Sequence, residues 1–164
     1  ARTNVSTEEE TLELPDYDCK PLILLLYSKE DEAVRKEFLK LLFLAMRDVA
    51  LQFVDVYEAV PSSIKDAEAY QRRLVDAARI VIALVTPNAM SIPVFPLAEQ
   101  ALAAEKLIPI RVEEIGLNGS PFRLEITGLP RDGRFISDGP NRNSAWVEVA
   151  KALHVFFETL KEEV

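Results

Sequence analysis

Residues 80–99 have the sequence Ile80-Val-Ile-Ala-Leu-Val-Thr-Pro-Asn-Ala-Met-Ser-Ile-Pro-Val-Phe-Pro-Leu-Ala-Glu99. The apolar run Ile80–Val85 predicts a strand that is covered on both faces, and Pro93 and Pro96 indicate a loop after it. An Ala/Leu-rich helix is then expected to begin at Pro96, because its first position needs no backbone N–H. This places Glu99 in the first turn, where the helix dipole favours a carboxylate. Glu99 is therefore either a helix-capping residue or part of a site at the carboxyl end of a strand.

Apolar runs and helical periodicity alternate along the rest of the chain, which predicts a parallel sheet with helices on both faces. We expect an α/β fold of the flavodoxin-like, doubly wound, five-stranded type. The expected strands are Leu22–Tyr27, Val49–Val56, Ile80–Val85, Leu107–Val112 and Arg134–Ser137. Helices are expected after Ser28, after a cap at Ser62 or Ser63, from Pro96, over a short segment near 121–126, and after a cap at Ser144. Pro109 indicates that its strand lies at an edge, or that the proline lies near a strand end.

The composition indicates one acidic globular domain. The chain has 164 residues, 49% of them hydrophobic, and a net charge of −8. We expect a polar tail or linker over residues 1–20, with any order near Leu12 and Leu14, and one domain over 21–164. The negative charge argues against binding to nucleic acid or anionic membranes, and no apolar run is long enough to span a bilayer. One cysteine, Cys19, and one histidine, His154, make a disulfide and a zinc site unexpected and fit a reducing, cytoplasmic compartment.

Several common chemistries lack their motifs. The turn after the first expected strand, Tyr27-Ser-Lys-Glu-Asp31, contains no glycine, which argues against dinucleotide and P-loop phosphate cradles. A Gly-x-Ser-x-Gly elbow is absent from the sequence. The acidic constellation of a phosphorylated receiver domain is also missing, because Asp55 has no such partners.

The order of several motifs resembles the Toll/interleukin-1 receptor (TIR) domains. Leu24-Leu-Leu-Tyr-Ser-Lys-Glu-Asp-Glu32 is similar to their opening box, and Leu84-Val-Thr-Pro-Asn-Ala-Met-Ser91 to their third-strand box. Phe95-x-x-x-Glu99 resembles the aromatic-x-x-x-Glu element, and Leu107-Ile-Pro-Ile-Arg111 the fourth strand. Residues 121–146 resemble bacterial TIR domains in particular. Departures lie in the loop after the second strand, where Val60-Pro-Ser62 lacks the usual glycine, and at Phe95-Pro96.

The resemblance implies an NAD+ nucleosidase of bacterial defence or signalling, with NAD as substrate and no cofactor. It implies that Glu99 is catalytic and orients the ribose, that Tyr27 and Ser28 border the ribose or nicotinamide, and that Phe95 packs beneath Glu99 or against a ring of the substrate. The loop of Pro61 would form a lid or contact a second protomer. The expected partners are other TIR domains and further domains of a longer protein.

Other interpretations stay open at this stage. Many TIR domains are non-catalytic modules that self-associate and recruit partners, and NAD turnover by concentrated protein separates these two classes. A nucleoside deoxyribosyltransferase could share the fold and also use a glutamate. Phe95 and Tyr27 could be packing residues only, and Trp146 and His154 on the last helix are expected to be structural.

Overall fold

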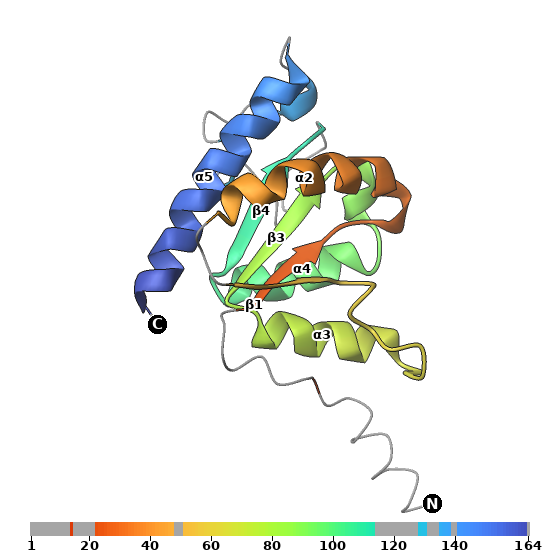
Figure 1. The fold of residues 1–164 in the computed structure, drawn as a ribbon. Helices are drawn as coiled ribbons and strands as arrows, with labels where there is room; N and C mark the ends of the chain where they lie inside the picture. Colours follow the sequence, from red (N-terminus) through yellow and green to blue (C-terminus); the bar gives the residue numbers. More distant parts are fainter. Residues whose placement is uncertain are drawn as a thin grey trace, which may run out of the picture.

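The computed structural model describes Leu14 and residues 22–47, 51–113, 128–130, 135–138 and 141–163. The expected tail therefore lies outside the described residues except for Leu14, which packs against the core. Cys19 and the helical segment expected near 121–126 also lie outside them. The rest of the chain forms alternating strands and helices (Figure 1).

Four parallel strands form the described sheet, in the order β2-β1-β3-β4. Their bounds are β1 Leu22–Leu26, β2 Gln52–Asp55, β3 Ile80–Val85 and β4 Leu107–Arg111. Every residue of the two central strands, β1 and β3, is buried, as their unbroken apolar runs predict. Leu24 is in register with Val54 on one side and Val81 on the other. The α/β class and the parallel sheet are confirmed, and the strand order is compatible with a flavodoxin-like fold.

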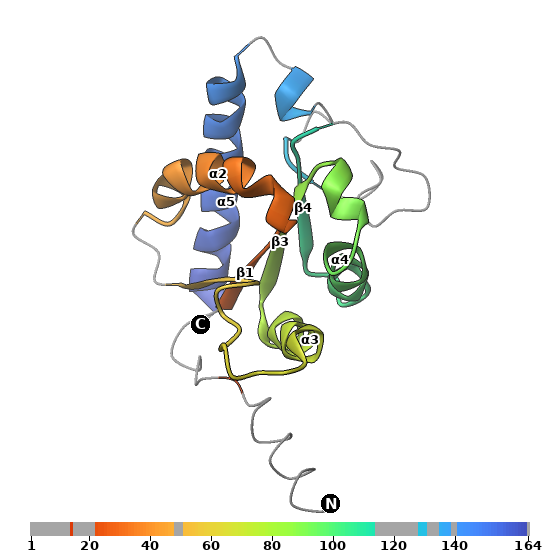
Figure 2. The same ribbon diagram turned by 90° about the vertical axis from the view of Figure 1, so that its right-hand side faces the viewer.

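Helices cover both faces of this sheet (Figure 2). One face carries α2 (Glu32–Ala45) and α5 (Arg142–Glu163), and the other carries α3 (Ala67–Ala77) and α4 (Val94–Ala103). The ring centroids of Phe38 on α2 and Trp146 on α5 lie 6.1 Å apart. The Trp146 indole also donates a hydrogen bond of 2.9 Å to Glu37, so its contacts are those of a packing residue. No helix in the described part of the chain has the length and apolar character needed to cross a membrane.

The expected fifth strand is wrong, because Ile136–Asp138 forms a 3₁₀ turn, η3. The outer side of β4 is instead contacted by Leu129, which pairs with Ile110 in a single parallel bridge. Its N–H donates to Pro109 at 2.8 Å, and its carbonyl accepts from Arg111 at 2.7 Å. Pro130 follows and has no N–H to extend the pairing. Pro109 thus lies in the edge strand of the described four-stranded sheet, as predicted.

Two expected helix caps are also wrong, because a better-placed residue nearby takes the role. Asp66 caps α3 and accepts a hydrogen bond of 3.0 Å from the Ala69 N–H, in place of Ser62 or Ser63. At the start of α5, Asn141 accepts from the Ser144 N–H at 3.0 Å, so Ser144 lies inside the helix. Asp and Asn cap helices as well as Ser does, so the sequence alone left the choice open.

Candidate functional site

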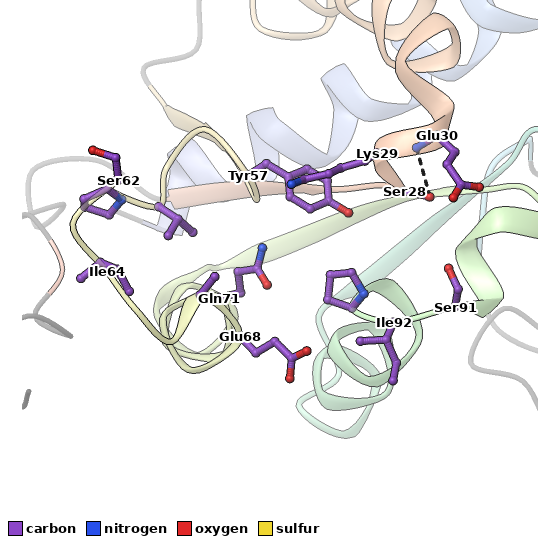
Figure 3. Close-up of a pocket in the computed structure, with 14 residues that line it drawn as sticks. Ser28, Lys29, Glu30, Tyr57, Ser62, Ile64, Glu68, Gln71, Ser91 and Ile92 are labelled. Atoms are coloured by element: carbon purple, nitrogen blue, oxygen red, sulfur yellow. Dashed lines mark hydrogen bonds between the residues drawn. The ribbon is translucent and has the colours of Figure 1, made fainter.

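A cleft of about 560 Å³ opens at the carboxyl ends of the strands (Figure 3). One wall comes from residues 28–30, which follow β1, and another from Tyr57, residues 60–62 and Ile64 of the loop after β2. The start of α3 contributes Glu68 and Gln71, and the loop before α4 contributes residues 91–93. The lining thus comes from the segments that follow β1, β2 and β3, which are distant in sequence.

The position of the cleft follows from the chain topology. The connection after β1 leads to α2 on one face of the sheet, while the connection after β3 leads to α4 on the other (Figure 2). Because β1 and β3 are neighbours, their loops part at this point and leave a crevice. Open α/β sheets bind ligands at such a switch point. The fold alone therefore favours this cleft as the binding site.

Asp55, the last residue of β2, fixes the loop that carries Tyr57. Its Oδ1 accepts hydrogen bonds from the backbone N–H groups of Tyr57, at 2.8 Å, and Glu58, at 3.1 Å. Its Oδ2 accepts from Arg35 Nε at 2.7 Å, and both of these charged side chains are largely buried. Such charge-assisted bonds hold geometry well. The first turn after β2 is consequently tied to α2.

Tyr27 lies behind Tyr57 and does not line the cleft. The two rings meet edge to face with centroids 5.1 Å apart, and the Arg35 guanidinium lies 5.6 Å from the Tyr27 ring centroid. Burial raises the pKa of Tyr27, and the hydrogen bond with Asp55 raises that pKa further. Burial also raises the pKa of Tyr57. Both phenols therefore stay protonated at physiological pH.

The rim of the cleft carries both signs of charge. Lys29 is exposed, and its ammonium lies 5.0 Å from the centroid of the Tyr57 ring, within the range of a cation–π contact. Glu30 and Glu68 are exposed carboxylates on opposite sides (Figure 3). Ser28 is buried, and its hydroxyl accepts a hydrogen bond of 3.3 Å from the Glu30 N–H. The site can therefore meet a ligand with cationic and anionic parts.

A hydrogen-bond cluster joins the loops that follow β1 and β3. The Thr86 hydroxyl donates to Asp31, and the Asn88 amide donates to the other Asp31 oxygen at 2.8 Å. Asp31 and Thr86 are both buried. The two loops that flank the switch point are thus held to each other from beneath.

Glu99 does not lie in the first turn of α4. The helix begins at Val94, two residues before Pro96, and Glu99 is exposed in the second turn. Pro96 is tolerated there because the first N–H groups of a helix have no partner within it. The dipole argument for Glu99 is therefore wrong, since that effect fades beyond the first turn. Glu99 is also not among the residues that line the cleft.

The structure brings together only some of the predicted site residues. Ser28 and Pro61 line the cleft, whereas Tyr27 supports it from behind and the half-buried Phe95 lies outside its lining. Sequence reasoning missed Tyr57, Glu68 and Gln71. The signal available for the last two was their spacing of three residues, which places them on one face of α3.

No model of a known protein family matches the sequence. Curated proteins give no match either.

Among the described residues, no three His, Cys, Asp or Glu side chains form a group that could hold a metal ion.

Proposed function

We propose that this protein is a TIR-type NAD+ nucleosidase that binds NAD in the cleft at the switch point. The observation that carries the proposal is the cleft itself, which joins the opening box, the loop of Pro61 and the segment before α4. The opening box and the segment before α4 carry part of the resemblance to TIR domains, whereas the loop of Pro61 departs from their usual sequence. The lone cysteine fits a cytoplasmic setting for this activity.

The reaction breaks the bond between ribose C1′ and the pyridinium nitrogen. The bonding electron pair goes to the nitrogen, so nicotinamide leaves as a neutral molecule. Water then adds to C1′ and releases a proton, which yields ADP-ribose. The transition state resembles an oxocarbenium ion, so a nearby carboxylate stabilises it.

The charges of the rim suit the two ends of this substrate. The carboxylates of Glu30 and Glu68 favour the cationic nicotinamide ring, and Lys29 is the cation of the cleft lining that can approach the pyrophosphate. Attraction between opposite charges near a protein surface orients a ligand before it binds.

Glu99 is the catalytic carboxylate of this proposal. Pro93 lines the cleft, and Glu99 lies six residues further, about 9 Å along the axis of α4. Side chains on a helix tilt toward its N-terminus, which here is the cleft end. Because Glu99 is exposed in the single chain, we propose that self-association encloses it and completes the site.

A concentration series of nicotinamide release from NAD tests this proposal. Wild-type activity should rise more steeply than linearly with protein concentration, and Glu99→Gln should lose about a hundredfold or more. Glu148→Gln is the matched control, because Glu148 is an exposed residue of α5 on the other face of the sheet. Full activity of folded Glu99→Gln would overturn the role of Glu99. If the wild type releases no nicotinamide at any concentration, even when the protein is clustered artificially, the proposed enzymatic activity is overturned.

A non-catalytic association module is the second candidate, and exposed apolar side chains favour it. Ile92, which lines the cleft, is 71% exposed, and Met90, two residues earlier, is 40% exposed. Adjacent exposed apolar side chains often mark protein-binding surfaces. Sedimentation of wild type and Ile92→Asp tests this candidate. Wild-type association that Ile92→Asp weakens, together with no NAD turnover, would favour the module over the enzyme.

A further inference from the structure

Gln71 is a buried amide in the wall of the cleft. It lies on α3, only 3% of the residue is exposed, and it lines the cleft. Its Nε2 donates a hydrogen bond of 3.2 Å to the carbonyl of Val56, the residue after β2. A carbonyl can only accept, so this contact assigns the nitrogen end of the amide and leaves no ambiguity about a flip.

The amide oxygen of Gln71 is consequently directed away from Val56 and toward the cleft (Figure 3). No donor from the described part of the chain reaches this oxygen, and it is not sealed from the cleft either. A bound molecule can therefore contact it. A ligand that covers the oxygen without donating a hydrogen bond would leave a buried acceptor unpaired, which is costly.

The neighbours of this oxygen restrict the kind of group that can approach. The same cleft lining includes the apolar surface of Tyr57, Ile64 and Pro93, while the Glu68 carboxylate lies one turn earlier on the same helix as Gln71. The Glu68 carboxylate and the Gln71 oxygen accept hydrogen bonds, and one of the two Gln71 N–H groups is engaged by Val56. A flat ring with an N–H donor at its edge fits such surroundings.

We propose that Gln71 is a specificity-determining residue that accepts a hydrogen bond from an NH2 group, an amino group or a carboxamide, carried by a planar heteroaromatic ring. The inference rests on the proposed function, because NAD offers two such donors. One is the carboxamide of nicotinamide, and the other is the amino group of adenine. In either case an analogue with only acceptors at that position is rejected, because two lone pairs face each other.

Calorimetric titration of the full chain with three dinucleotides tests the proposal. They are NAD, its nicotinic acid analogue and its 6-methoxypurine analogue, each of which replaces one NH2 donor with an acceptor. Wild type should bind one analogue at least about tenfold more weakly than NAD, and that analogue identifies the ring at Gln71. Gln71→Met should lose this discrimination while retaining a side chain of similar length.

Gln100→Met is the matched control. Gln100 lies on α4 and donates to Arg72 and Asp76, outside the cleft lining, so discrimination should persist. Equal wild-type affinity for all three dinucleotides would overturn the role of Gln71 whether or not the variant folds. Discrimination that persists in folded Gln71→Met would overturn it too. Failure of wild type to bind NAD at all would overturn the proposed function, and the Gln71 assignment with it.

Discussion

The Thr86 hydroxyl donates a hydrogen bond to the Asp31 carboxylate, although 55 residues separate them in the chain. Thr86 follows β3, and Asp31 ends the 3₁₀ turn η1 (Lys29–Asp31) after β1. The pair holds together the two loops between which the switch-point cleft opens. The shape of the candidate site therefore depends on a contact that lies beneath it.

Replacing Thr86 with valine should destabilise the fold by about 1–3 kcal/mol, because a buried carboxylate loses a hydrogen-bond donor. Valine keeps the shape of threonine, so the packing changes little. Thr86→Ser retains the hydroxyl and should lie closer to wild type. Urea unfolding monitored by circular dichroism measures both variants. Equal stability of the Val and Ser variants would contradict the role given to this hydrogen bond.

The contacts of the Glu37 carboxylate predict that the fold loses stability in acid. The two hydrogen bonds from Arg142, at 2.6 and 2.8 Å, are the main cause that lowers the pKa of Glu37, while burial acts in the opposite direction. The folded chain therefore binds this proton less readily than the unfolded chain. The stabilisation is fully present above the ordinary pKa of 4.5 and is lost as the pH falls through the lower folded value.

Glu37→Gln should consequently unfold with less dependence on pH below 4.5 than wild type. Trp146 donates to Glu37 and is the single tryptophan, so its fluorescence reports on this contact during urea unfolding. Glu148→Gln, an exposed carboxylate on the same helix, is the control and should follow wild type. If the free energy of unfolding of Glu37→Gln falls with decreasing pH as steeply as that of wild type, the role given to Glu37 in acid unfolding is refuted.

The sequence was a good guide where a physical signal was strong and local. The runs of β1 and β3 contain apolar residues only, which leaves a doubly covered strand as the best interpretation. The starts of helices were harder to predict than the buried strands. Four nearby residues can all cap a helix: Ser63, Asp66, Asn141 and Ser144. Tertiary packing then decided among them.

The candidate site was only partly predictable for a related reason. Ser28 and Pro61 belong to loops that strand ends mark in the sequence. Gln71 lies inside a helix among other polar residues, and only the position of the Val56 carbonyl distinguishes it from an exposed glutamine. The placement of Glu99 depended on a helix start that was wrong by two residues, which moves Glu99 from the first turn of α4 to the second, where the helix dipole no longer favours its carboxylate.

The close packing around Gly128 predicts that even a small substitution there destabilises the edge of the sheet, where the fifth strand was expected. A Cβ at Gly128 would lie 2.6 Å from Arg111 Nη1 and 2.8 Å from the carbonyl oxygen of Pro109. That carbonyl also accepts the Leu129 N–H. Gly128→Ala should push the segment off β4 and destabilise the fold by about 1–3 kcal/mol, in the range found for overpacked sites.

The measurements are urea unfolding and amide hydrogen exchange at Leu129, which should accelerate in the variant. The amide of Val81, which donates to Lys106 at the other end of the β3–β4 pair, is the internal control and should exchange as in wild type. Unchanged protection at Leu129 in Gly128→Ala would show that the edge tolerates the methyl group and that the close approach is not required.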